Sequence, residues 1–329
     1  LVILLSLTYA NTLAHAQTPV EAFARMPKFA DLVVSPDGKY FAAKMELEGI
    51  YTLTIFEILG NDLKLTYQGK TTDDIGVRWI EWASPTRLLV SLGKAYRRGG
   101  PPVTETRLIA MNYDGSNPKS MISPKKTSGG MALQIQDRVI DFLPHDPDHI
   151  IMEYNEDNIA KARANRVNIH NARDKVLQGG KSDIYEWGTD RQGNIRWGWG
   201  RKDNTWWYTI RDVDNKNWRT ITEGIWGSGK EFSIWGFTSN PNVMIVASNH
   251  ETGKNAIYEY NLSTNSFGRE IFSHPSVDVS HVMWNKKNWT VRRVAYTIDG
   301  THYKWFDPVA EADYNNIQKA LQNQSLSVV

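Results

Sequence analysis

The sequence predicts an all-β protein, a β-propeller with about six recognisable four-stranded blades and a short helix at each end. Three observations carry this prediction. From Phe29 onward, short apolar runs of strand type are separated by turn residues, and helical periodicity is almost absent. A strand–turn–strand phrase recurs six times, with starts 45 to 61 residues apart, close to the ~40–50 residues of one blade. The chain has 329 residues, enough for such a ring.

The recurring phrase is a strand, a turn rich in Pro, Asp, Asn or Gly, and a strongly apolar returning strand. Its first copy contains Ser35-Pro36-Asp37-Gly38, in which Pro and Gly occupy the places that a tight turn favours. The six copies are VVSPDGKYFAAKM, RWIEWASPTRLLVSL, VIDFLPHDPDHIIMEY, YEWGTDRQGNIRWGWG, IWGFTSNPNVMIVAS and VMWNKKNWTVRRVAYT. A third strand with half-buried alternation follows in the first five copies, as expected for the outer part of a blade. Two packed β-sandwiches would not give such a long-period repeat.

The N-terminal residues predict export. Residues 1–16 hold an uncharged apolar run followed by Ala14-His15-Ala16, which is typical of a signal peptide that is cleaved near Ala16. The run lacks an initiating Met and a basic segment, so we expect a partial signal peptide and a periplasmic or secreted protein. The run is too short to span a bilayer comfortably, and no later segment is predicted to do so.

Two short helices flank the predicted ring. Residues 17–28 are expected to form a leader helix, with Thr18 as N-cap and Pro19 at the first helical position. At the other end, Asp307 is the expected N-cap of a helix in which apolar side chains recur at 310, 314, 317 and 321. Residues 29–329 are then the propeller domain, which does not end on a strand that could close the ring. We therefore expect an incomplete seven- or eight-bladed ring, truncated at its C-terminus.

Composition excludes several classes of function. The formal net charge of +2 gives no field for binding nucleic acid or an anionic membrane. Cysteine is absent, which excludes disulfides, thiolate metal sites and a cysteine nucleophile. His145 and His149 bracket a turn, and Asp212-Val213-Asp214-Asn215 resembles half of a calcium loop, but both are better explained as turn chemistry. No catalytic, cofactor-binding or metal-binding residue is predicted.

Tryptophan is concentrated in one part of the chain. Eight of the 13 Trp residues lie between positions 187 and 235. Packing between blades requires large flat side chains, so we favour a packing role for this region. The alternative, that some of these rings line a channel or a cleft that binds peptide or sugar, stays open at this point.

Several of these segments also resemble a known family. The leader VEAFARMPKFADLVVSPDGKYFAAKM, the phrases VRWIEWASPTRLLVS and TDRQGNIRWGWG, and the tail YKWFDPVAEADYNNIQKAL resemble the N-terminal β-propeller of the prolyl oligopeptidase family of serine peptidases. The similarity is greatest to its exported bacterial branch of acylaminoacyl-peptidase-like and dipeptidyl-peptidase-like enzymes. It covers nearly the whole chain after the signal peptide.

The resemblance implies a partner domain that this sequence does not contain. In the family, the propeller precedes an α/β-hydrolase domain that carries a Ser-Asp-His triad, and the nucleophile lies in a Gly-x-Ser-x-Gly turn. No such pentapeptide occurs in these 329 residues. We therefore predict the substrate-gating, non-catalytic part of a serine exo- or oligopeptidase hydrolase that acts on short peptides, inactive alone. The alternative is a stand-alone exported propeller of the TolB or lectin type that binds a protein or glycan partner.

Overall fold

The computed structural model describes residues 26–69, 74–96, 103–122, 133–155, 161–214 and 217–321. The predicted signal peptide over residues 1–16 lies outside these residues. So does most of the predicted leader helix, of which only Met26, Pro27 and Lys28 are described, and these three form no helix. No helix in the described part of the chain has the length and apolar character needed to cross a membrane.

The described residues form six antiparallel sheets, each made of strands that follow one another in the chain. The first sheet comprises β1 (Phe29–Val34), β2 (Tyr40–Leu47), β3 (Ile50–Leu59) and β4 (Asp62–Gln68). The second comprises β5 (Ile75–Trp82), β6 (Arg87–Tyr96), β7 (Val103–Asn112) and β8 (Lys119–Ser120). The third comprises β9 (Val139–Asp141), β10 (His149–Glu153), β11 (Ala164–Asn168) and β12 (Asp174–Gln178).

The remaining sheets continue the pattern. The fourth comprises β13 (Ile184–Thr189), β14 (Ile195–Lys202), β15 (Thr205–Arg211) and β16 (Trp218–Ile225). The fifth comprises β17 (Phe232–Phe237), β18 (Val243–Ser248), β19 (Ala256–Asn261) and β20 (Ser266–Phe272). The sixth contains three strands within the described residues: β21 (Val279–Asn285), β22 (Thr290–Thr297) and β23 (Thr301–Trp305).

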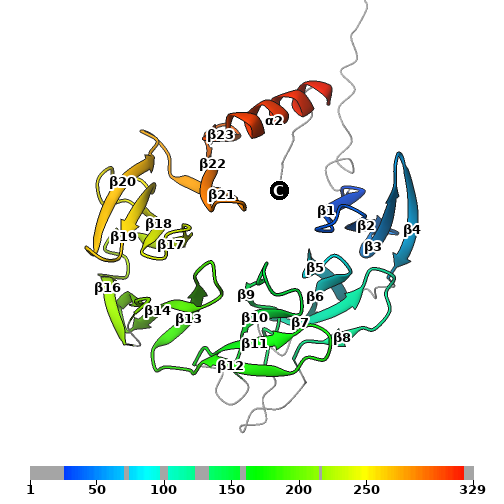
Figure 1. The fold of residues 1–329 in the computed structure, drawn as a ribbon, viewed down its shortest axis with the longest axis horizontal. Coiled ribbons are helices and arrows are strands. Elements are labelled where there is room, and N and C mark those ends of the chain that lie inside the picture. The colour runs from blue at the N-terminus through cyan, green and yellow to red at the C-terminus, as the bar shows by residue number, and fades with distance from the viewer. Residues whose placement is uncertain are drawn as a thin grey trace, which may run out of the picture.

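The sheets stand around a common axis as the blades of a propeller (Figure 1). The first strand of each sheet lies nearest the centre, and the last lies at the periphery. Each of the six predicted phrases spans the first two strands of one sheet and the turn between them. The predicted all-β propeller is therefore confirmed.

The core is divided among the junctions between consecutive sheets. Each of the five hydrophobic clusters in the described residues combines side chains from two neighbouring sheets, from the first and second to the fifth and sixth. Strand β6 shows how this arises: Leu88 and Val90 belong to the cluster with the first sheet, whereas Leu89 belongs to the cluster with the third. Because successive side chains in a strand point to opposite faces, a continuous apolar run buries both faces of a blade.

Helix α2 (Pro308–Ala320) follows the sixth sheet and begins where the sequence predicts. The Asp307 carboxylate accepts a hydrogen bond from the Ala310 N–H at 3.2 Å, and Pro308 opens the first turn. Tyr314 packs on Tyr303 and Trp305 of the sixth sheet, at ring-centroid distances of 5.6 and 5.4 Å. In Figure 1 the helix lies between the sixth and the first sheets.

Candidate functional site

One end of the ring carries the loops between the first and second strands of the sheets, at residues 35–39, 83–86, 142–148, 190–194, 238–242 and 286–289. We call it the turn end. The first of these loops shows how its residues are used. The Ser35 hydroxyl donates to the Asp37 carboxylate at 2.7 Å and accepts from the Tyr40 N–H at 3.0 Å, while Gly38 takes a left-handed φ of 72°. These side chains build the turn.

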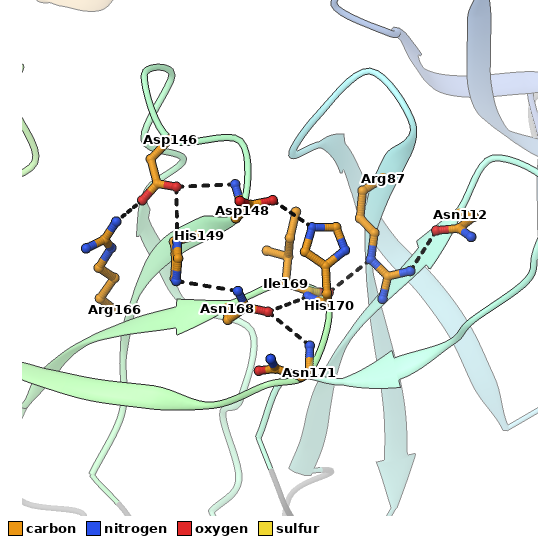
Figure 2. Close-up of polar contacts among 10 residues, drawn as sticks. All are labelled: Arg87, Asn112, Asp146, Asp148, His149, Arg166, Asn168, Ile169, His170 and Asn171. Atoms are coloured by element: carbon orange, nitrogen blue, oxygen red, sulfur yellow. Dashed lines mark hydrogen bonds and ion pairs between the residues drawn. The ribbon is translucent and has the colours of Figure 1, made fainter.

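Arg87 joins the second sheet to the third at the turn end (Figure 2). It is 2% exposed, and its Nε donates to the Ile169 carbonyl of the third sheet at 2.9 Å. Its other nitrogens donate to Asn112 Oδ1 and to the carbonyls of Asn117 and Ala110, at 2.9 to 3.2 Å. Burial lowers the pKa of Arg87, and the four acceptors stabilise the guanidinium in place of water.

The fourth and fifth sheets are joined in the same way. Arg196 donates to the Pro241 carbonyl at 3.0 Å and pairs with Asp190 at 3.2 Å, both side chains being almost fully buried. Farther from the axis, Arg219 donates to the Leu262 carbonyl at 2.7 Å. In each case an arginine of one sheet binds a backbone oxygen of the next sheet, so these residues fix the relative position of two blades.

Arg191 reaches farther, from the fourth sheet to the sixth. Its Nε donates to the Phe237 carbonyl at 2.5 Å, and its guanidinium lies 4.2 and 4.0 Å from the ring centroids of Trp284 and Trp289. The guanidinium lies close to Gly236, and a Cβ atom added at this glycine would be 3.0 Å from Arg191 Nη2. Burial lowers the pKa of Arg191 to about 10, so it stays charged at neutral pH and the two indoles hold a cation between them.

Of the two histidines that bracket the turn of the third sheet, His149 is the one whose contacts Figure 2 shows. Asp146 accepts from His149 Nδ1 at 3.0 Å and pairs with Arg166. Asp148 pairs with His170 Nε2 at 3.0 Å. Within the described ranges, no group of three or more His, Asp or Glu side chains is placed to hold a metal ion.

The calcium-like segment is also occupied by protein groups. Asp212 accepts from Arg219 Nε at 2.8 Å and from Nη2 at 2.9 Å, and these hydrogen bonds hold the pKa of Asp212 below its ordinary value. The side chain of Asp214 is exposed, and Asn215 lies outside the described residues. Asp212 directly follows strand β15, and its bidentate ion pair with Arg219 explains why an acidic residue lies there.

The tryptophan-rich region packs both faces of the fourth sheet. Trp187 contributes to the junction with the third sheet, and Trp206 to the junction with the fifth. Four rings lie over a glycine directly opposite on the neighbouring strand: Trp187 on Gly198, Trp197 on Gly188, Trp206 on Gly224 and Trp207 on Gly200. Added Cβ atoms at these glycines would lie 2.0 to 2.7 Å from the rings, so each glycine provides the space that an indole fills. The packing interpretation fits these contacts, and Trp226 is the ring most open to solvent, at 59%.

A buried carboxylate links the second and third sheets. Asp137, which precedes β9, accepts from the Ser91 and Thr106 hydroxyls at 2.6 and 2.7 Å and lies 3.5 Å from Arg78 Nε. Arg78 is 45% exposed on β5, so one buried carboxylate joins a solvent-facing cation of the second sheet to the third. The residues of this contact come from four separate segments of the chain.

Glu153 forms the corresponding contact between the third and fourth sheets. Its Oε2 accepts from the Trp187 N–H at 2.6 Å, and its Oε1 pairs with Arg138 at 2.9 Å. Arg138 also pairs with Glu186 at 3.1 Å. Burial raises the pKa of Glu153 to about 7, although the charge of Arg138 opposes this. No sequence signal singles out Glu153, Arg87 or Arg191, because their partners lie in other sheets.

Solved structures with a similar fold were found by comparison with known proteins. No protein-family model matches the sequence, and no curated protein matches it. Among solved structures, a prolyl oligopeptidase B from Galerina marginata bound to a 35mer hydrolysis and macrocyclization substrate aligns with a TM-score of 0.54 and 10% identity, over 84% of this chain and 42% of that one. This is the propeller fold found in the prolyl oligopeptidases.

Two further structures agree. A prolyl endopeptidase, from a study of inter-domain dynamics in catalysis and specificity, aligns with a TM-score of 0.54 and 10% identity, over 87% of this chain and 45% of that one. An oligogalacturonate lyase in complex with manganese aligns with a TM-score of 0.52 and 10% identity, over 87% of this chain and 80% of that one. The chain therefore spans less than half the length of these peptidases and most of the lyase.

Proposed function

We propose that this chain is the substrate-gating, non-catalytic portion of an exported serine exo- or oligopeptidase that acts on short peptides. The observation that carries the proposal is the alignment with the prolyl oligopeptidases: it takes in 84 to 87% of this chain but only 42 to 45% of theirs. The resemblance of the leader, the blade phrases and the Asp307-Pro308 tail supports the same family. No Gly-x-Ser-x-Gly pentapeptide occurs in the sequence, so the nucleophile would have to come from another domain.

The ring architecture supports a gating role. A ring set over an active site limits the size of what can enter, and it keeps bulk water from the reaction. The ring must hold its shape for this, and the junctions supply that rigidity through apolar clusters and arginine contacts to the carbonyls of neighbouring blades. Export to the periplasm or the cell exterior is proposed from residues 1–16.

The reading frame that follows Val329 in the gene tests the proposal. We expect a Gly-x-Ser-x-Gly motif in a strand–turn–helix context, followed by Asp and His partners. A stop codon directly after Val329 would contradict the peptidase assignment.

A second test uses the chain itself. The purified chain should not turn over aminoacyl chromogenic substrates, whereas the protein encoded by the longer frame should, with mutation of its motif serine as the control. Turnover by the chain without that frame would show that the catalytic group lies within these 329 residues.

A further inference from the structure

A cavity of about 400 Å³ opens at the turn end between the third and fourth sheets. Its lining includes three apolar side chains, those of Leu143, Ile151 and Leu177, which we call the floor. Its walls carry Asp141 and Asp146 together with Arg166 and Arg191, among other residues of loops 142–148 and 190–194. A volume of this size is in the range of sites for small molecules.

Asp141 is the carboxylate on the side of the cavity near the axis. One of its oxygens accepts from the Leu143 N–H at 2.8 Å, and no Lys, Arg or His of the described chain pairs with it within 4.0 Å. Arg191 also lines the cavity, but its guanidinium is held between Trp284 and Trp289. Burial raises the pKa of Asp141, while the Leu143 N–H, a hydrogen bond with Thr189 and the charge of Arg191 act in the opposite direction.

Arg166 provides positive charge on the outer side. It lies on β11, two strands from β9, which ends at Asp141, and strands in a sheet are about 4.8 Å apart, so the two strands are separated by about 10 Å. Arg166 is 43% exposed and pairs with Asp146 (Figure 2). A guanidinium has five N–H donors, so this single carboxylate contact leaves donors for a further acceptor.

The floor is held in a fixed shape by an unusual backbone. Leu143 has a φ of 47°, in the left-handed region that bulky residues rarely adopt. Its side chain lies against Gly193, where an added Cβ would be 2.4 Å from Leu143 Cδ2. Gly193 itself has a φ of 77°, so glycine satisfies both the backbone and the close approach. The apolar floor therefore exists before any ligand arrives.

We propose that this cavity binds a small zwitterion with an apolar body, of which a free dipeptide is the representative. The ammonium group binds Asp141, the apolar side chains pack on the floor, and the carboxylate binds Arg166. A dipeptide spans about 7 Å along its backbone, and a hydrogen bond of about 3 Å at each end lets it join the two charged groups. The inference goes beyond the proposed peptidase function and does not depend on it.

Isothermal titration of the whole chain with alanyl-leucine, N-acetyl-alanyl-leucine and alanyl-leucine amide tests the site. We expect alanyl-leucine to bind, and removal of its positive charge by acetylation to weaken binding about 10-fold or more, as for a charge-assisted hydrogen bond. The amide should bind more weakly than the free dipeptide, because it loses the contact with Arg166. Asp141→Asn should weaken alanyl-leucine about 10-fold or more.

The Asp141→Asn variant and the acetylated ligand together form a double-mutant cycle, which tests whether the ammonium group and Asp141 contact each other. If the ammonium binds Asp141, then N-acetyl-alanyl-leucine should bind Asp141→Asn and the unmodified chain equally. Asp148→Asn is the matched control, because Asp148 lies in the same loop, does not line the cavity and pairs with His170, and it should leave binding unchanged.

Three results would overturn the inference: no heat of binding with alanyl-leucine, equal binding of its acetylated form by the unmodified chain, or full binding by a folded Asp141→Asn chain. The modified ligands act on the unmodified chain, so the inference stays falsifiable if the variant does not fold. Failure here would leave the peptidase proposal intact, because that proposal depends on the reading frame after Val329.

Discussion

Replacement of Glu153 by Gln should change how the stability of the ring depends on pH. Glu153 is 7% exposed, and burial raises its pKa from 4.5 to about 7 in the folded chain. The folded state therefore binds this proton more tightly than the unfolded state. The stabilisation that results is fully present below pH 4.5 and is lost as the pH rises through about 7.

The size of the effect follows from that difference. The interval between 4.5 and about 7, at about 1.4 kcal/mol for each pH unit, corresponds to about 3 kcal/mol of unfolding free energy. Glutamine keeps the shape of the side chain and can still accept from the Trp187 N–H, but it does not titrate. The unfolding free energy of Glu153→Gln relative to that of the unmodified chain should therefore rise by about 3 kcal/mol from pH 4.5 to pH 8.

Urea unfolding of both chains at several pH values between 4.5 and 8 measures this difference. Glu186→Gln is the matched control, because Glu186 pairs with the same Arg138 but is 40% exposed, and we expect a change below about 1 kcal/mol. If the unfolding free energies of Glu153→Gln and the unmodified chain stay parallel over this pH range, the buried carboxylate does not titrate as argued.

Three further changes test other contacts. Arg87→Met should lower the unfolding free energy measured in urea by about 3 kcal/mol or more, because buried carbonyls lose their hydrogen-bond donor. Arg173→Met, at an exposed position, should have almost no effect. Gly200→Ala should lower the unfolding free energy by about 1–3 kcal/mol, because the added Cβ would lie 2.3 Å from the Trp207 ring. Gly76→Ala, where the added Cβ meets open space, should leave stability almost unchanged. Equal effects of the two substitutions would refute the packing argument. Asp307→Ala should speed amide exchange in the first turn of α2, with a loss of about 1 kcal/mol, and unchanged exchange would show that the cap is not needed.

The sequence predicted the inner half of each blade well and the outer strand poorly. The six phrases correspond to the first two strands of the six sheets, because these strands are apolar and joined by turns of distinctive composition. Strands β4, β8, β12 and β20 were not predicted. β4 shows the reason: Asp62–Gln68 is mostly exposed, with Leu63 and Leu65 at 57% and 51%, so burial leaves no strong pattern in its sequence.

Of the contacts at the turn end, the sequence could predict only the local ones. That the turns around Ser35 and His149 serve local structure follows from residue types and short spacings, and the contacts agree. Arg87 and Glu153 could not be singled out, because each acts on a backbone group of another sheet: the Ile169 carbonyl and the Trp187 N–H. A backbone group has no side-chain signature, so the sequence of one blade does not indicate which residue of its neighbour will bind it.

The same contacts explain how six phrases so different in sequence can build one repeated architecture. Arg87 and Arg196 bind the carbonyls of Ile169 and Pro241 in the following sheets, and Trp187 Nε1 donates to the Ala162 carbonyl of the preceding sheet at 2.8 Å. Carbonyl acceptors are present whatever the side chain, so each blade can change its turn residues without a matched change in its neighbour. What must persist is the two-faced apolar pattern of the inner strands, because every junction core is shared by two sheets. A ring built in this way tolerates sequence divergence in its loops, and the loops at the turn end are where the cavity and its charged groups lie.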